Sequence, residues 1–286
     1  MSRRFPVLGI ALGGGGARGF AHIGVFKALQ HAGIFPRLVA GTSMGGIVGA
    51  MYARGMSAEQ MEVAVQRAIR GRTDMIRALD LKLTQTGFVR GARIYDYIAQ
   101  VIGPETTFAA LHRPLAVVAV DLNTGREVVL ESGRVADAVR ATISVPGVFV
   151  PVEIGAMRLV DGGMLNNLPV DVVRHMGADV VIAVDVLPSF QANTPGLPPV
   201  VPPLQPRRAL RAYRELWNTV MIMISASTEA HVQQWPPEVL LRPNLAPDLD
   251  MLIGFDRSRE AIVAGEEAAT AALEQILTVI NTEIEL

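Results

Sequence analysis

The sequence of 286 residues contains no cysteine, and this absence excludes disulfides, thiolate metal sites and a cysteine nucleophile together. The five histidines are scattered without the spacing of metal ligands, so we expect no metal site. Basic and acidic side chains nearly balance, at 26 against 27. Binding of nucleic acid by phosphate neutralisation needs a basic excess, so we expect no nucleic-acid partner.

Long apolar runs are missing as well. The uncharged stretch Leu216–Thr228 falls short of the roughly 20 residues that a membrane-spanning helix needs. The segment Met1–Leu12 carries two arginines and an apolar run, but it passes directly into glycines and has no small-residue cleavage site. This pattern favours a first strand over a signal peptide. We therefore expect a cytoplasmic protein, and a peripheral contact with the inner membrane face stays open.

Half of the residues are hydrophobic and 19% are charged, a composition that can fill a sizeable core. Along the first two thirds, short apolar runs alternate with helical patterns, which predicts an α/β fold with a mostly parallel sheet flanked by helices. The predicted strands are Val7–Leu12, Leu38–Gly41, Leu115–Asp121, Glu127–Leu130 and Asp179–Val186, and the predicted helices are Ala17–Ala32, Gly45–Arg54, Ala58–Arg70, Arg93–Ile102, Val135–Thr142 and Val170–Met176.

The last third begins with seven prolines between Pro188 and Pro206, which predict a surface loop. A helix with an apolar stripe follows it, and its start is rich in arginine; the stripe is Leu210, Tyr213, Trp217, Val220 and Ile224, and the arginines are Arg207, Arg208, Arg211 and Arg214. This helix either packs on the sheet or lies on an anionic membrane surface. A strand at Val239–Leu241 and one helix over about Asp256–Ile280 close a single domain spanning residues 1–286.

A glycine-rich turn joins the first predicted strand to the first helix and reads Gly13-Gly14-Gly15-Gly16-Ala17-Arg18-Gly19. Such a turn can aim several N–H groups at one point, where the start of the helix adds positive partial charge. The turn also contains G-x-G-x-x-G, but a dinucleotide site would need an acidic residue about 20 positions later. Residues 20–58 contain neither Asp nor Glu, so we expect a different negatively charged group here.

A second turn of this kind follows the strand Leu38–Gly41 and reads Gly41-Thr42-Ser43-Met44-Gly45. The pattern G-x-S-x-G is typical of a nucleophile elbow, in which the flanking glycines relieve crowding and expose the serine hydroxyl. An activated serine also needs hydrogen-bond donors for the oxyanion that it creates. Because the glycine-rich turn two elements earlier can supply them, the two turns together indicate acyl transfer.

The serine needs a base, and the sequence favours an aspartate over a histidine. The only histidines after Asp161 are His175, at the end of a predicted helix, and His231, which follows an apolar helical segment without a loop signal. By contrast, Asp161-Gly162-Gly163 directly follows the apolar segment Met157–Val160. This places a carboxylate at the end of a strand, with glycines that allow close approach, so we predict Asp161 as the base.

These residues together resemble the patatin-like phospholipase family. The resemblance is carried by residues 14–19, 41–45 and 161–163 and by two further stretches, Ala141–Phe149 and Asn166–Val170. It extends over about residues 7–186, and the segment from Val239 onward is similar to bacterial relatives of the catalytic domain of neuropathy target esterase. It implies a three-layer patatin-like fold and a Ser–Asp dyad that works without metal or cofactor.

The expected reaction is hydrolysis of acyl esters of phospholipids or lysophospholipids through an acyl-enzyme. Ser43 attacks the ester carbonyl and Asp161 receives its proton. The predicted oxyanion hole consists of the N–H groups of Gly14, Gly15 and Gly16 with the charge of Arg18 nearby, and the residues predicted to support the turns are Gly19, Gly41, Gly45, Gly162 and Gly163. An ordinary Asp has a pKa of about 3.9, so this role requires burial beside an apolar pocket to raise it.

Two alternatives use the same catalytic parts differently. An acyltransferase would pass the acyl group to an alcohol or thiol, and product analysis with and without acceptor separates it from a hydrolase. A regulatory protein would keep the fold without turnover, and it would fail to react with a fluorophosphonate probe. The sequence does not indicate the oligomeric state.

Overall fold

The computed structural model describes residues 3–69, 91–188, 207–246, 249, 254–282 and 284–285. Within them the main sheet is built from β2 (Leu8–Leu12), β3 (Leu38–Thr42), β4 (Leu115–Asp121), β5 (Arg126–Leu130), β6 (Val152–Ile154), β7 (Met157–Asp161), β8 (Val180–Val184) and β9 (Val239–Leu241). Their spatial order is β6-β7-β4-β3-β2-β8-β9, and β5 pairs with β4.

The centre of this sheet is parallel. β2 pairs in parallel with β3 and β8, and the parallel pairing continues to β4 on one side and to β9 on the other. β5, β6 and β7 form antiparallel pairs at the β4 side. The predicted mostly parallel sheet is therefore confirmed, with antiparallel strands at one edge.

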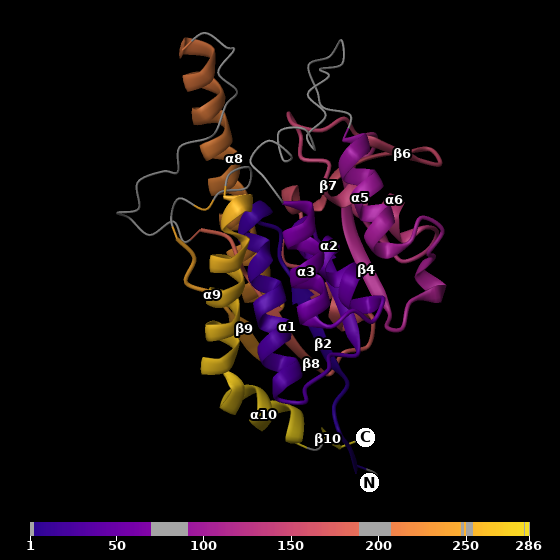
Figure 1. Cartoon of the computed structure of the whole chain (residues 1–286), viewed down its shortest axis with the longest axis vertical. Helices are drawn as coiled ribbons and strands as arrows, with labels where there is room; N and C mark the ends of the chain where they lie inside the picture. Colours follow the sequence, from indigo (N-terminus) through magenta and orange to yellow (C-terminus); the bar gives the residue numbers. More distant parts are fainter. Residues whose placement is uncertain are drawn as a thin grey trace.

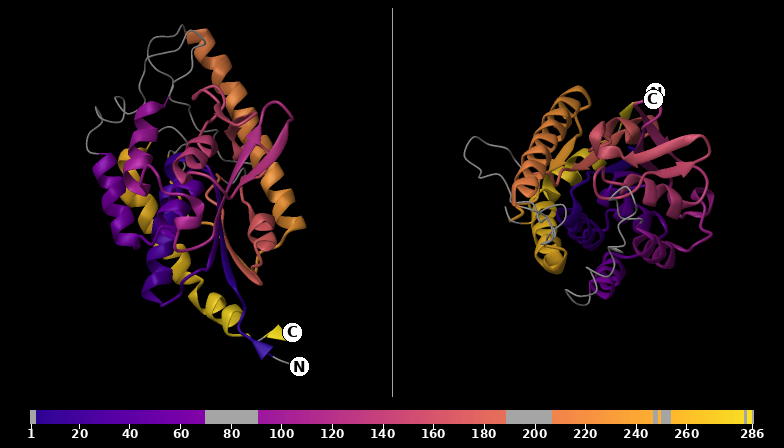
Figure 2. Two further views of the ribbon diagram at one scale, coloured as in Figure 1. Left: turned by 90° about the vertical axis from the view of Figure 1, so that its right-hand side faces the viewer. Right: turned by 90° about the horizontal axis from the view of Figure 1, so that it is seen from above.

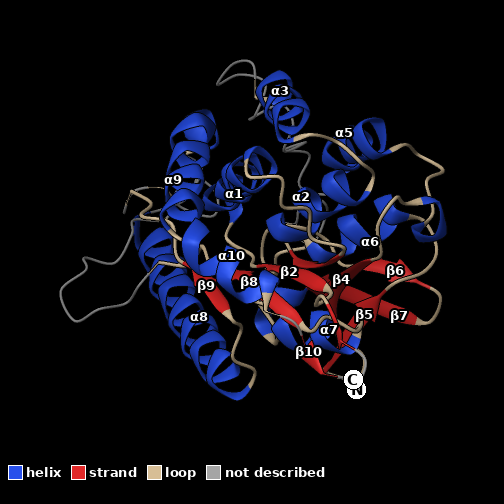
Figure 3. Ribbon diagram, turned by 90° about the horizontal axis from the view of Figure 1, so that it is seen from below, coloured by secondary structure: helices blue, strands red, loops and turns tan. Residues whose placement is uncertain are grey.

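Helices cover both faces of the sheet, which confirms the expected three layers. The helical elements are η1 (Gly16–Phe20), α1 (Ala21–His31), α2 (Met44–Ala53), α3 (Ala58–Ala68), α5 (Ala92–Ile102), α6 (Val135–Thr142), α7 (Val170–His175), α8 (Arg207–Gln234), α9 (Ser258–Ala271) and α10 (Leu273–Asn281). Figure 3 shows α7 and α8 on one face and α1, α2, α3, α5, α6 and α9 on the other. The left view of Figure 2 shows the sheet between them.

The side chains of β2 show why both faces need a cover. Ile10 and Leu12 belong to the larger core under α1 and α2, whereas Ala11 belongs to a second core under α7 and the end of α8. All five residues of β2 are buried, as expected for a strand covered on both sides. Small side chains on the second face let α7 approach the sheet closely.

Several predicted boundaries differ from the structure. The predicted helix Ala17–Ala32 is divided into η1 and α1, and the predicted last helix is divided at Ala272, where φ is −97° and ψ is 0°. Because neither Gly nor Pro lies at Ala272, the helical periodicity of the apolar residues continues through this break in the sequence. β6 was not predicted, because this strand is short and only partly buried. β1 (Arg3–Arg4) and β10 (Ile284–Glu285) were not predicted either; they pair beside the chain ends in Figure 1.

The proline-rich segment falls almost entirely on residues 189–206, which lie outside the described residues. α8 follows as a helix of 28 residues, and the side chains of its arginine-rich start also lie outside the description. Farther along α8, Val232 packs into the core beneath β8. The helix therefore packs on the sheet, as one of the two sequence interpretations expected.

Candidate active site

The predicted functional turns converge at one edge of the sheet, where the parallel strands end. Leu12 is in register with Gly41 of β3 and with Val184 of β8, so the turns that follow β2 and β3 leave the sheet side by side. Ligand sites of open α/β sheets lie at this edge. The register thus brings the glycine-rich turn next to Ser43.

Ser43 lies in a strained turn between β3 and α2. Its φ is 54° and its ψ is −122°, and among the described residues no other non-glycine residue has a positive φ. The glycines on either side permit the turn, because a Cβ on Gly41 would lie 2.4 Å from the carbonyl oxygen of Gly45. The Ser43 N–H donates to Thr142 Oγ1 at 2.8 Å. These are the features of a nucleophile elbow, in which strain is part of the site.

Asp161 ends β7 and faces the same point. Only 5% of its surface is exposed, and the Gly163 N–H donates to its Oδ1 at 2.8 Å. Burial raises the pKa of Asp161 to about 6, and the Ser43 side chain and the Gly163 N–H act against this rise. Its buried Oδ2 has no partner with full hydrogen-bond geometry among the described residues. The expectation of a raised pKa is thus confirmed, and desolvation is its physical cause.

The predicted oxyanion donors divide into two groups. The Gly14 N–H donates to the carbonyl oxygen of Asn167 at 3.1 Å, so it is already engaged. The N–H groups of Gly15 and Gly16 have no acceptor in the described part of the chain. Gly16 has a φ of 55°, which favours glycine and directs the backbone into η1. Gly14 lines the cavity together with Ser43, and Gly15 and Gly16 follow it in the turn.

Arg18 occupies a different place from the one expected. Its Nε donates to the carbonyl oxygen of Val186 at 2.6 Å, and its Nη1 donates to the carbonyl oxygens of Ala246 and Leu249 at 3.3 and 3.2 Å. The side chain is buried and is not among the residues that line the cavity. Arg18 therefore ties the start of η1 to two distant segments rather than facing Ser43.

The five predicted supporting glycines all lie at close contacts. A Cβ on any of them would come within 2.1 to 2.8 Å of another atom; they are Gly19, Gly41, Gly45, Gly162 and Gly163. Real Cβ atoms do not approach so closely, so a larger residue would move the neighbouring chain. The turns that carry Ser43 and Asp161 are therefore packed without room for side chains.

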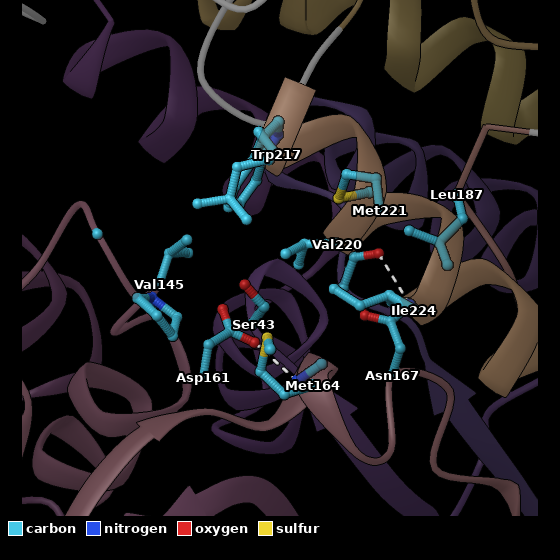
Figure 4. Close-up of a pocket in the computed structure, with 15 residues that line it drawn as sticks. Ser43, Val145, Asp161, Met164, Asn167, Leu187, Trp217, Val220, Met221 and Ile224 are labelled. Carbon is cyan, nitrogen blue, oxygen red and sulfur yellow. Dashed lines mark hydrogen bonds between the residues drawn. The ribbon is translucent and has the colours of Figure 1, made fainter. Parts of the chain in front are cut away.

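Ser43 and Asp161 open into a cavity of about 250 Å³. Its polar side chains are Ser43, Asp161 and Asn167, and its other side chains are apolar. Figure 4 shows Trp217, Val220, Met221 and Ile224 of α8 on the side opposite Ser43 and Asp161. The site therefore combines a serine hydroxyl and a buried carboxylate with an apolar wall.

Within the described part of the chain, no histidine lines this cavity. His231 Nε2 pairs with Asp171 Oδ1 at 2.9 Å, and His175 packs edge-on against Trp235. His22 is fully buried, and its Nε2 lies 2.7 Å from the Gly13 carbonyl oxygen. Burial lowers the pKa of His22 to about 4, so at neutral pH it is an uncharged donor to the glycine-rich turn.

Three features of the site were not predicted from the sequence: the contacts of Asn167, those of Thr142, and the apolar wall from α8. Asn167 and Thr142 lie within stretches that carried the family resemblance, and each hydrogen-bonds to one of the catalytic turns. The apolar wall from α8 could not be found from the sequence, because helical periodicity does not say which element a face meets. No group of three or more acidic or histidine side chains in the described ranges is arranged to hold a metal ion. Likewise, no helix there has both the length and the apolar composition to span a bilayer.

This chain is similar in sequence to known proteins. An uncharacterised NTE family protein of Mycobacterium tuberculosis is 35% identical over 277 residues, covering 93% of this chain and 46% of that protein. Patatin-like phospholipase domain-containing protein 6 of Mus musculus is 37% identical over 183 residues, covering 63% of this chain and 13% of that protein. The chain thus spans less than half the length of these relatives.

One solved structure shows the same fold. Human GIVD cytosolic phospholipase A2 superposes with a TM-score of 0.51 at 11% identity, covering 96% of this chain and 60% of that one. The sequence profile of patatin-like phospholipase matches residues 10–174. This segment is more than half of the chain and includes both Ser43 and Asp161, and the chain therefore belongs to the patatin-like phospholipase family.

Proposed function

We propose that this protein hydrolyses fatty-acyl esters of phospholipids or lysophospholipids through a Ser43–Asp161 dyad. The observation that carries the proposal is the meeting of Ser43, in a strained elbow, with the buried Asp161 at the end of one apolar cavity. A serine nucleophile needs a base within reach. Asp161 is the titratable group among the described residues that line this cavity.

The reaction proceeds in two halves. Ser43 Oγ attacks the ester carbonyl while its proton passes to the Asp161 carboxylate, which creates a tetrahedral oxyanion. When this intermediate collapses, the ester C–O bond breaks and the proton leaves with the alcohol. Asp161 then takes a proton from a water molecule, whose oxygen attacks the acyl-enzyme carbonyl. Collapse of the second intermediate releases the fatty acid and returns the proton to Ser43.

The raised pKa suits Asp161 to this role. A carboxylate with a pKa of about 6 remains ionised at neutral pH, yet it is a stronger base than an exposed aspartate. Its Oδ1 is held by the Gly163 N–H, which leaves Oδ2 as the oxygen that takes the proton. Burial raises this pKa, and the apolar wall of the same cavity is the surface that binds the acyl chain.

The oxyanion is stabilised by the N–H groups of Gly15 and Gly16. These donors have no acceptor among the described residues. Gly15 precedes η1 and Gly16 is its first residue, so the N-terminus of η1 adds positive partial charge at both. One such donor is worth about 3 to 4 kcal/mol at the transition state. Gly14 shapes the turn through its hydrogen bond to Asn167, and Arg18 holds the turn in place through carbonyl contacts.

The cavity mouth has an apolar rim suited to a lipid surface. Leu216 of α8 and Met164 of the turn after Asp161 line the cavity and are 64% and 39% exposed. Next to these lining residues in the sequence, Leu165 is 44% exposed, and Ile222 and Met223, which follow Met221 on α8, are 52% and 66% exposed; we include them in the rim. Exposed apolar patches of this kind mark interaction sites. We infer that this rim contacts the membrane surface from which the lipid is taken.

The dyad is tested with Ser43→Ala, Asp161→Asn and the double variant. Hydrolysis of a lysophospholipid and of a soluble ester should fall by several orders of magnitude in each single variant. The double variant should be no worse than Ser43→Ala, because the two residues act as a unit. A fluorophosphonate should label the wild type and not Ser43→Ala. Substantial turnover by folded Asp161→Asn would overturn the dyad, and absence of both turnover and labelling in the wild type would overturn the hydrolase.

Membrane contact is tested with sedimenting vesicles of neutral or anionic lipid. Met223→Ser and Leu165→Ser remove apolar surface from the rim and should weaken binding to both, whereas Val63→Ser on α3, which is 44% exposed, is the matched control. Because arginines begin α8 in the sequence, binding to anionic vesicles should also weaken with added salt. Rim variants that bind as tightly as the wild type would contradict the contact.

A further inference from the structure

Trp217 lines the cavity where α8 packs against the segment before β6. Its side chain lies on α8 and packs against Val145 and Phe149, which form a small apolar cluster of their own beside the main core. Val145 and Trp217 also line the cavity, and Figure 4 shows Val145 to the left of Ser43 and Trp217 above it. The indole therefore bridges α8 and the segment before β6.

The rest of the α8 wall runs away from Trp217 along one face of the helix. Val220 and Ile224 follow at steps of three and four and line the cavity with Met221, and Leu187 faces them beyond Ile224. Met221 and Ile224 are buried. Among the described side chains of α8, only apolar ones line the cavity.

The half of α8 beyond the cavity is anchored. His231 Nε2 pairs with Asp171 Oδ1 at 2.9 Å, and Arg242 Nη2 donates to Glu229 Oε2 at 2.5 Å. Val232 is buried against the sheet. A helix held at three points after its cavity face presents that face as a fixed wall, so its side chains set the size of the space in front of Ser43.

We propose that this face of α8 limits the length of the acyl chain that the cavity binds, and that Trp217 sets the longest chain. We call this face the acyl-chain gauge. The inference rests on the proposed function, because it assigns the apolar cavity to the acyl group of the ester that Ser43 attacks. Buried apolar surface favours each added methylene by about fourfold in binding. That gain ends when the chain reaches Trp217.

The size of the cavity sets the expected length. The cavity of about 250 Å³ is finite, so its apolar lining can cover an acyl chain only up to a limiting length. Chains beyond that length must leave part of their surface in water. Replacing the indole by a methyl group joins the space occupied by Trp217 to the cavity and lengthens the chain that fits.

The gauge is tested by kcat/KM for soluble p-nitrophenyl esters with acyl chains of two to sixteen carbons. For the wild type, kcat/KM should rise by about fourfold per methylene and level off, within this series, at the length at which the chain fills the cavity. In Trp217→Ala the rise should continue for about two further carbons or more, and in Val220→Phe it should stop about two carbons earlier. The control is Trp235→Ala, which removes a second indole that packs beneath the sheet and does not line the cavity.

A binding measurement separates failure of the gauge from failure of the hydrolase. Calorimetric titration of Ser43→Ala with alkyl carboxylates of six to fourteen carbons, below their micelle concentration, needs no turnover. The affinity should level off at the same length as kcat/KM, and Ser43→Ala/Trp217→Ala should move that limit to longer chains. Circular dichroism and thermal unfolding identify variants that fold.

Each outcome decides one of the two ideas. A length limit that is the same in the wild type, in folded Trp217→Ala and in Trp235→Ala would overturn the gauge, and so would a limit that Trp235→Ala moves equally. If no ester is hydrolysed but the binding limit moves in Trp217→Ala, the hydrolase fails and the chain-binding site stands. If Val220→Phe does not fold, the comparison of Trp217→Ala with Trp235→Ala still decides.

Discussion

Asn167 hydrogen-bonds twice to Gly14: its carbonyl oxygen accepts the Gly14 N–H at 3.1 Å, and its Nδ2 donates to the Gly14 carbonyl oxygen at 3.3 Å. Gly14 belongs to the glycine-rich turn, and Asn167 follows the turn that begins at Asp161. The neighbouring carbonyl of Asn166 also accepts the Thr42 hydroxyl at 2.9 Å. The segments that carry the proposed oxyanion donors, the proposed base and the proposed nucleophile are therefore joined by hydrogen bonds through the dipeptide Asn166-Asn167.

Asn167 variants should report on this connection. Asn167→Ala removes the side-chain bond and keeps the main-chain bond, so we expect kcat to fall by about ten- to a hundredfold with little change in KM. Asn167→Asp places a second carboxylate beside Asp161, which should raise the pKa of Asp161 and shift the acid limb of the pH profile upward. Equal loss in both variants with an unchanged pH profile would mean that Asn167 acts only through folding.

The raised pKa of Asp161 predicts how activity depends on pH. The carboxylate must be ionised to accept the proton of Ser43, so kcat/KM should fall about tenfold per pH unit below the pKa of the free enzyme, which is about 6. Above this value it should stay level until another group titrates. Measurements of kcat/KM between pH 3 and 8 give this limb, and a midpoint near pH 4 would contradict the raised pKa of Asp161.

The same group predicts how stability depends on pH. Folded Asp161 keeps its proton up to about pH 6, and the unfolded chain releases it near 3.8, so the native state binds more protons between these values and loses stability as pH rises. This cost reaches about 3 kcal/mol at neutral pH. Asp161→Asn does not titrate there, so its unfolding free energy relative to the wild type should increase from pH 4 to pH 7. A pH-independent difference in urea unfolding would contradict the shift.

Backbone strain at Ser43 predicts an unusual order of stability. At an ordinary helix or strand position, glycine is less stable than alanine by about 0.5 to 1 kcal/mol. At Ser43, with φ at 54° and ψ at −122°, only glycine adopts the conformation without strain of about 1 to 3 kcal/mol. Ser43→Gly should therefore unfold at a higher denaturant concentration than Ser43→Ala, although both are inactive. The reverse order would indicate an unstrained turn.

The histidines predict a further separation of dyad from triad. His112→Gln, His175→Gln and His231→Gln should keep kcat/KM within about tenfold of the wild type, because no proton transfer passes through them. His22→Gln should lose stability instead, since His22 is fully buried and bonds to the Gly13 carbonyl. A folded His175 or His231 variant as inactive as Ser43→Ala would require an imidazole base.

Gly15→Ala should slow acylation more than it changes folding, for a reason that only the structure supplies. The sequence suggests that a Cβ would crowd the anion site directly. In the structure that Cβ would lie 2.6 Å from Val186 Cγ2, so the turn must move away from Val186 and carry its N–H donors with it. We expect kcat to fall by about a hundredfold, and Gly15→Ala/Val186→Ala should recover part of the loss. Full activity of folded Gly15→Ala would place the oxyanion elsewhere.

The sequence alone determined the elements and the chemistry of each turn. Strands such as Leu115–Asp121 and Val239–Leu241 were predicted with the bounds that the structure has, because continuous apolar runs bounded by polar residues have few other interpretations. Ser43 was predicted from its flanking glycines, and Asp161 from its place after an apolar segment. These signals depend only on residues that are close in the sequence, so they can be recognised in one sequence without an alignment.

The tertiary structure decided what those turns face. The pKa of Asp161, the engagement of the Gly14 N–H by Asn167, the contacts of Arg18 and the apolar wall of α8 all join residues far apart in the chain. A helical stripe such as the one through Trp217 shows that a face is apolar, but it does not say whether a sheet, a membrane or a substrate covers it. That choice depends on the packing of α8 against β8 and β9, because desolvation and hydrogen bonding depend on every neighbour in space and not on neighbours in sequence.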